Sequence, residues 1–389
     1  MTDPTPAPAA PARPAPAPPA LPARALLLLP GAFALLAGLD AALVLLGLPA
    51  PVPDTRLGEV HGIVLALGFV GTVIALERAV AAGRALGYLA PAALGAGAIG
   101  LVLGAPRALA DPVLVAGTVG LLGLYVLLWR RAADLAVLIQ AAGAVLAIGA
   151  ALLWWADLPV PQLIPWLSGF LILTIAGERL ELARIVMSSG RTQAVLAAAA
   201  TGYVVAALAA LLWPAVGYPL LGAALLGLTG WLAARDIARG TVRGSGLPRY
   251  MAVCLLAGYG WLLVPAGLWL LTGPVVTGRG YDAVVHAVML GFVMSMIMAH
   301  APVILPAVLR RPLPYTRWLY LPVALLHASL LLRIAVGDGQ DIQGAVSTGG
   351  VLNIVAIVVF VVIAAGSAVR GARPAQERGA RPAQERGEQ

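Results

Sequence analysis

The sequence predicts an all-α integral membrane protein of about twelve transmembrane helices, arranged as three four-helix units around a pseudo-threefold axis. Three observations predict this fold: the composition, the spacing of the apolar runs and an internal repeat. Of the 389 residues, 61% are hydrophobic and 11% are charged, whereas a soluble domain is roughly 45–50% apolar. A water-soluble fold could not bury that much apolar surface, so the lipid bilayer is the expected partner.

The spacing of the apolar runs sets the number of helices. A bilayer core about 30 Å thick needs about 20 apolar residues per helix, and runs of that length recur between Arg-, Pro- and Gly-rich breaks. They fill a transmembrane domain at 25–370, between two tails at 1–24 and 371–389 that we expect to be disordered. The predicted spans are 25–47, 57–78, 83–104, 113–131, 134–155, 163–185, 192–213, 216–235, 249–272, 281–305, 316–336 and 347–369.

The arginines predict the orientation. All 25 basic residues are Arg, and cytoplasmic loops of membrane proteins carry an excess of basic residues. With the N-terminus in the cytoplasm, 21 of the 25 are cytoplasmic, and the four outside are Arg56, Arg107, Arg279 and Arg333. We therefore expect a protein of the bacterial inner membrane with both termini cytoplasmic. The net charge of +8 then reflects topology, and no nucleic-acid partner is expected.

An internal repeat predicts the pseudo-threefold arrangement. Three segments close the second, sixth and tenth predicted helices, and the first two match at six of eleven positions. Glu77 and Glu178 occupy the same position in these two copies, and His300 occupies it in the third. The alternative is that apolar sequence of low complexity matches itself by chance. The segments are GFVGTVIALER at 68–78, GFLILTIAGER at 169–179 and GFVMSMIMAHA at 291–301.

All four histidines fall inside predicted helices. An ionisable side chain in the membrane is a functional-site hypothesis by default; the alternative is a neutral ring that hydrogen-bonds a neighbouring helix. His61 and His286 lie five and seven residues inward from outer-side arginines, which places both near the outer surface. His300 and His327 each lie ten residues from an arginine on the cytoplasmic side, so they form a second, inner pair at matched depth.

Two imidazoles that face each other at equal depth can hold a b-type haem without any cysteine attachment. We therefore expect haem iron at His61 and His286, and haem iron or copper at His300 and His327. His286 and His300 are fourteen residues apart on one helix, which corresponds to about 21 Å and to nearly the same face. The nearby glycines would leave room for a flat macrocycle, although glycine is also common where membrane helices pack closely. These glycines are Gly62, Gly68, Gly71 and Gly291.

The other intramembrane polar residues have simpler explanations. The Glu77–Arg78 and Glu178–Arg179 pairs lie at predicted helix ends, where ion pairing and snorkelling explain them. The alternative is a role in taking up protons. Interhelical hydrogen bonds are expected for Asp40, Gln140 and Asn353.

Two segments, LGEVHGIVLALGFVGTVIALERAV at 57–80 and GYDAVVHAVMLGFVMSMIMAHAPVILPAVL at 280–309, resemble the NnrS family of haem- and copper-containing membrane proteins linked to bacterial nitric oxide metabolism. More distantly, they resemble subunit I of the haem–copper oxidases. The resemblance implies a twelve-helix pseudo-threefold fold and a low-spin haem between helices 2 and 10, whose ligands would be His61 and His286. Helices 6 and 7, which carry the oxidase copper ligands, contain no histidine here. A proton-pumping oxygen reductase is therefore not expected.

The expected function is that of an NnrS-like haem-binding membrane protein, working in electron transfer or in the handling of nitric oxide or another diatomic gas. An electron donor and a small diatomic gas would be its partners, and whether it is an enzyme stays open. A first alternative is a proton-coupled multi-pass transporter without a redox cofactor, in which the histidines relay protons with Glu77 and Glu178. A second is an accessory membrane protein whose histidines are structural.

Overall fold

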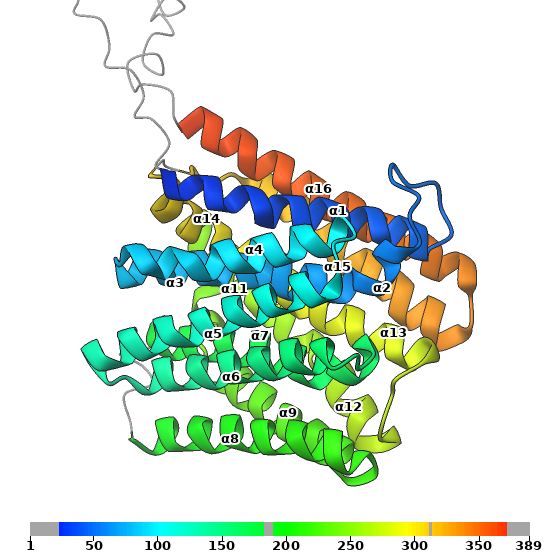
Figure 1. The fold of residues 1–389 in the computed structure, drawn as a ribbon, viewed down its shortest axis with the longest axis horizontal. Helices are drawn as coiled ribbons and strands as arrows, with labels where there is room; N and C mark the ends of the chain where they lie inside the picture. The colour runs from blue at the N-terminus through cyan, green and yellow to red at the C-terminus, as the bar shows by residue number, and fades with distance from the viewer. Residues whose placement is uncertain (1–22, 183–189, 311–312, 372–389) are drawn as a thin grey trace, which may run out of the picture.

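The computed structural model describes residues 23–182, 190–310 and 313–371 (Figure 1). This part of the chain contains twelve helices long and apolar enough to cross a membrane, and no strand. The prediction of an all-α, multi-pass membrane protein is therefore confirmed. The predicted tails lie almost wholly outside the described residues, although Ala23 and Arg24 already begin the first helix.

Several spans consist of more than one segment. The spans are η1 (Ala23–Leu27) with α1 (Leu28–Leu45); α2 (Arg56–Ile63), η2 (Val64–Gly71) and α3 (Thr72–Ala82); η3 (Ala85–Tyr88) with α4 (Leu89–Val102); α5 (Arg107–Ala132); α6 (Leu135–Trp155); α7 (Val160–Leu182); α8 (Gly190–Leu212); α9 (Pro214–Arg235); α11 (Gly246–Trp261) with α12 (Leu263–Thr272); α13 (Gly278–His286), η4 (Ala287–Met294) and α14 (Ser295–Leu309); η5 (Arg317–Leu319), α15 (Tyr320–Leu330) and η6 (Leu331–Asp338); and α16 (Gln343–Gly371). A short helix, α10 (Ala238–Thr241), follows α9.

The described chain begins and ends at the same end of the bundle, as an even number of spans requires. Figure 1 shows the first residues of α1 and the last residues of α16 together there, with α3 and α14. We call this the terminal end, and the opposite end, which carries α2 and α13, the distal end. The two ends differ in what their polar residues do.

The three spans that carry the repeated motif form the centre of the bundle. Their most apolar windows are 72%, 78% and 61% buried, whereas those of the other nine spans are 33–56% buried. The central span α7 contacts both α2 and η4, and α3 contacts α14. Contacts of α5 with α6, of α9 with α12 and of α16 with α1 join the three successive four-helix units. This is the pseudo-threefold arrangement that the repeat predicted.

Two π-helical segments repeat in register with the sequence. The alignment that places Gly68 on Gly291 also places the first and last residues of η2 on those of η4, because all three pairs are 223 residues apart. Each π segment is eight residues long and begins within three residues after a histidine. The first and third copies therefore share backbone geometry as well as residues.

Candidate functional site

A cavity of about 870 Å³ lies in the distal half of the bundle. Its walls come from α1, α2, η2, α7, α13, η4, η6 and α16, so it is surrounded by central spans and by helices of the first and third units. Pockets of about 300–1,000 Å³ are the size that holds drug-sized ligands and cofactors. The cavity is therefore large enough for an organic cofactor.

His61 of α2 and His286 of α13 both line this cavity. The two rings are close enough to interact electrostatically, and the Gly38 backbone of α1 lies beside the ring of His61. Nδ1 of His61 is buried and has no hydrogen-bond partner among the described residues. The structure thus brings together the two outer histidines, as their matched depth predicted.

A chain of side chains fixes the ring of His286. Its Nδ1 lies 2.8 Å from the carbonyl oxygen of Asp282 and 3.2 Å from Oδ1 of the same residue. A carbonyl oxygen can only accept, so Nδ1 carries the proton and the lone pair of the neutral ring is on Nε2. Arg333 of η6 holds the Asp282 carboxylate with two hydrogen bonds, of 2.8 and 2.7 Å. Such outer partners typically orient a metal-binding imidazole.

Sequence reasoning missed Asp282 altogether and treated Arg333 only as a topological signal. Asp282 precedes His286 by four residues, which places the two side chains on one face of α13. That spacing was visible in the sequence. The partnership with Arg333 was not, because it joins residues 51 positions apart.

The body of the cavity is apolar, and π-helical segments contribute to it beside α1, α7 and α16. The segments η2 and η4 supply eight of the apolar lining residues, and η6 supplies Arg333 and Asp338. Single π turns inside α-helices are often found at functional sites. The residues from η2 and η4 are Leu65, Ala66, Phe69, Val70, Met289, Leu290, Val293 and Met294.

Charged residues gather where the cavity reaches the distal end. Three of the four predicted outer-side arginines, Arg107, Arg279 and Arg333, line it there. Arg107 lies over the ring of Trp154, with its guanidinium carbon 4.2 Å from the ring centroid. The acidic members of this rim are Glu59, Asp157, Asp282 and Asp338. The site therefore combines apolar walls with a mouth that carries both arginines and carboxylates.

The glycines near the histidines serve helix packing. A Cβ on Gly62 would lie 2.8 Å from Val160, one on Gly68 would lie 2.4 Å from Ala98, and one on Gly291 would lie 2.4 Å from Trp261. A side chain at any of these positions would displace a neighbouring helix. The close approach of neighbouring helices explains these three glycines, whereas a Cβ on Gly71 would make only ordinary contacts; that the glycines leave room for a macrocycle stays a prediction.

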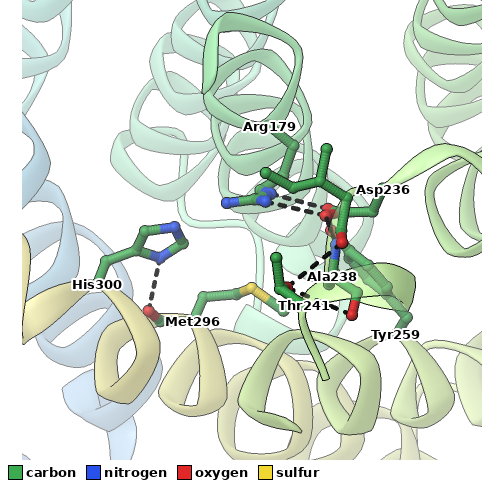
Figure 2. Close-up of polar contacts among 8 residues, drawn as sticks. Arg179, Asp236, Ala238, Thr241, Tyr259, Met296 and His300 are labelled. Carbon is green, nitrogen blue, oxygen red and sulfur yellow. Dashed lines mark hydrogen bonds and ion pairs between the residues drawn. The ribbon is translucent and has the colours of Figure 1, made fainter. Parts of the chain in front are cut away.

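His300 is buried on α14, towards the terminal end, and lies at the left of Figure 2. Its Nδ1 is 2.8 Å from the Met296 carbonyl oxygen, and its buried Nε2 has no partner among the described residues. The charged groups that act on the ring are Arg179 and Asp236. In Figure 2 the side chains of Arg179 and Asp236 lie to the right of the His300 ring.

Arg179 and Asp236 form a buried bidentate ion pair, with N–O distances of 2.8 and 2.9 Å. Asp236 also accepts hydrogen bonds from the Tyr259 hydroxyl at 2.6 Å and from the Ala238 backbone N–H at 2.8 Å. Burial by itself would raise the pKa of Asp236, which lies between α9 and α10, outside the spans. The hydrogen bonds and charge of Arg179 outweigh this effect and lower that pKa below its ordinary value.

His327 belongs to a different environment. The Trp261 indole N–H donates to its Nδ1 at 2.9 Å, and the two rings stack with their centroids 6.4 Å apart. Because Nδ1 accepts, the proton of the neutral ring is on Nε2, which then has no lone pair for a metal. His300 and His327 have different neighbours, so their pairing stays a prediction that these contacts do not support. No cluster of three or more His, Cys, Asp or Glu in the described part of the chain could hold a metal ion.

The predictions for the remaining intramembrane polar residues are confirmed in part. Arg78 is 8% exposed and contacts Glu77, so ion pairing is confirmed but snorkelling is wrong. Asn353 makes the predicted interhelical hydrogen bond, to Ser329 at 2.6 Å. Gln140 lies 3.4 Å from Arg78 of a neighbouring helix. Asp40, by contrast, accepts from the Val52 backbone N–H in the loop that follows its own helix.

Comparison with known proteins gives a family and no named relative. No curated protein and no solved structure matches the chain. The sequence profile of one family matches residues 24–369, which is the whole helical bundle apart from its outermost residues. The chain therefore belongs to the family described as "Domain of unknown function (DUF8744)".

Proposed function

We propose that this protein is an NnrS-like, haem-binding membrane protein that holds one b-type haem between His61 and His286 and works in electron transfer. One observation carries the proposal. Two histidines from central helices far apart in the sequence line the same large cavity. Nδ1 of His286 is held by the carbonyl and carboxylate oxygens of Asp282, and Arg333 in turn holds that carboxylate.

The residues of the cavity fit such a group. Imidazoles from two helices are the axial ligands that a b-type haem needs. The apolar side chains of η2 and η4 suit the flat face of a macrocycle. The three arginines at the mouth already pair with carboxylates, Arg279 with Asp341, Arg107 with Asp157 and Arg333 with Asp282, so acidic substituents of a haem would have to compete with these carboxylates.

Haem would supply a one-electron redox couple. The protein's own contribution is to fix the ring of His286 through Asp282 and Arg333, and to exclude water with apolar walls, both of which tune a potential. If His61 and His286 both held the iron, no position would remain for a gas, so electron transfer fits this cavity better than the binding of nitric oxide. Gas handling, or copper, would need a second site, for which His300 and His327 stay the candidates.

We also propose that the chain lies in a bacterial inner membrane with both termini in the cytoplasm. The support is the distribution of arginine, 21 of 25 on that side. The cavity would then face the outer side. Reporter fusions after residue 371, one active only in the cytoplasm and one only in the periplasm, test this; activity of the periplasmic reporter contradicts it.

The visible absorption spectrum tests the haem proposal. The protein is produced with haem supplied, purified in detergent, and compared with His61→Ala, His286→Ala and the control His327→Ala in reduced-minus-oxidised spectra. We expect a b-type signal in the wild type and the control, and its loss in both cavity variants. A colourless wild type, or a signal that survives in both cavity variants, would refute the proposal.

A proton-coupled transporter without a redox cofactor is the second candidate. The observation that favours it is the burial of acidic residues, because the side chain of Glu178 is only 12% exposed. If the wild type is colourless, proton flux into proteoliposomes of the wild type and Glu178→Gln is the next measurement. Equal flux in the two would refute this candidate as well.

A further inference from the structure

A second polar site lies at the terminal end, where α3, α5, α6 and α7 meet. Its centre is Arg78 of α3, which contacts its neighbour Glu77 and lies 3.9 Å from Glu178 and 3.6 Å from Glu181 of α7. Glu77 is sixteen residues from His61 along the same span, or about 24 Å. The site is therefore separate from the cavity.

Among the described residues, the charges of this site do not balance, because one guanidinium, Arg78, faces three carboxylates. The next arginine in this part of the chain, Arg179, acts on Glu178 but holds Asp236 with two of its nitrogens. Glu77 and Glu181 both repel Glu178, and in a buried site this repulsion is weakly screened. Binding of a positive charge would relieve it.

Buried polar atoms without partners point into the same site. Gln140 is fully buried; its Oε1 accepts from Arg78, and its Nε2 has no partner in the described part of the protein. The hydroxyl of Tyr125, also fully buried, is without a partner there and interacts electrostatically with Arg78, Glu178 and Glu77. Such atoms usually bind ordered water.

These atoms decide which positive charge fits. Nε of Arg78 and Nε2 of Gln140 are donors without partners, and donors repel a metal cation. The guanidinium of Arg78 also contacts the carboxylates that a metal would need. Water molecules can accept from both donors, and a proton can bind a carboxylate oxygen without displacing Arg78.

We propose that this site binds a proton, which Glu77 and Glu178 share in a small hydrated pocket with Tyr125 and Gln140. The proton forms an O–H bond to one carboxylate and a hydrogen bond, direct or through water, to the other, and no electrons are transferred. The groups that face it are Glu77 and Arg78 of α3, Tyr125 of α5, Gln140 of α6, and Thr174, Glu178 and Glu181 of α7.

The internal repeat supports a common role for the two glutamates. Glu77 and Glu178 occupy the same position in two copies of the motif, on two helices at the centre of the bundle. The site therefore joins equivalent positions of the first and second four-helix units. Its proton binding does not depend on what occupies the cavity.

Infrared spectroscopy of the full chain in lipid nanodiscs tests the proposal. At neutral pH we expect a protonated-carboxyl C=O band that shifts in heavy water. Glu77→Gln and Glu178→Gln should each abolish this band, because removal of either carboxylate leaves the other paired with Arg78 and ionised. Glu181→Gln, whose side chain is 41% exposed, removes a carboxylate that repels Glu178, so the band should remain but disappear at a lower pH than in the wild type.

Two further results sharpen the test. Tyr125→Phe should shift the band without removing it, because only a hydrogen-bond partner of the hydrated pocket is lost. Unchanged circular dichroism and elution volume show that each variant is folded. The proposal is overturned if the wild type shows no protonated-carboxyl band. It is also overturned if the band survives in Glu77→Gln or in Glu178→Gln.

Discussion

Two buried or partly buried bidentate Arg–Asp pairs of the described chain lie near histidines at opposite ends of the bundle. At the distal end Arg333 binds Asp282, and at the terminal end Arg179 binds Asp236, with all four N–O distances between 2.7 and 2.9 Å. The nearby histidines are also alike, because His286 and His300 each place Nδ1 2.8 Å from the carbonyl oxygen four residues earlier.

The two pairs differ in what surrounds the aspartate. Asp282 lies at the cavity, is 26% exposed and reaches the ring of His286 at 3.2 Å. Asp236 is fully buried, and its other contacts are the Tyr259 hydroxyl and a backbone N–H. The Arg333–Asp282 pair thus positions a candidate ligand at the cavity. The Arg179–Asp236 pair, which has no open space beside it, joins helices instead.

The largest expected effect concerns the buried pair. Asp236→Ala leaves the charge of Arg179 without a partner, and breaking a buried pair in this way typically costs about 3–5 kcal/mol. Thermal unfolding in detergent measures the loss. The matched variant Asp282→Ala should cost less, because its pair is partly exposed. An equal or larger loss of stability for Asp282→Ala would contradict the difference between the two pairs, in which Arg179–Asp236 joins helices and Arg333–Asp282 positions His286.

The second effect concerns cofactor affinity. Asp282→Asn weakens the acceptor that orients His286, and loss of such an outer partner typically lowers metal affinity about 10- to 100-fold. Haem titration of the apoprotein, followed by absorbance, checks this, and the redox potential should move with it. The control Asp236→Asn should leave haem affinity unchanged. A similar loss in both variants would show that the effect is general destabilisation.

The third effect is a pH dependence of stability. The pKa of Asp236 is lowered from its ordinary value of 3.8 by Arg179, so the folded state favours the ionised carboxylate. The stabilisation is therefore fully present above about pH 4 and is lost as the pH falls through the lowered pKa. Unfolding temperatures of wild type and Asp236→Ala should converge on acidification. A constant difference down to the lowest accessible pH would contradict this.

The smallest expected effect is that of His300→Leu on haem content. His300 shares its tautomer with His286 but faces no second imidazole among its contacts, so the variant should bind one haem per chain, like the wild type. The ratio of haem to protein, measured beside His286→Leu as the negative control, checks this. Two haems per chain in the wild type and one in His300→Leu would contradict this expectation and support a second haem at the inner histidines.

Much of the site could be read from positions along helices. Depth arithmetic placed His61 and His286 at one level, and both line the cavity. The same arithmetic placed His300 and His327 together, yet their rings have different partners. The π-helical segment η4 lies between His286 and His300. Each widened turn there changes the rotation of the helix, so a constant angle per residue no longer predicts which way His300 points.

By itself, the sequence determined twelve spans, a threefold repeat and the depth of each histidine, because apolar length and position along a helix are local properties of the chain. The tertiary structure decided the rest: that Arg333 reaches Asp282, that Arg78 is enclosed among three glutamates, and that a cavity remains beside His61. These depend on how each helix is rotated about its axis and how closely it packs, and neither quantity is encoded in any one segment.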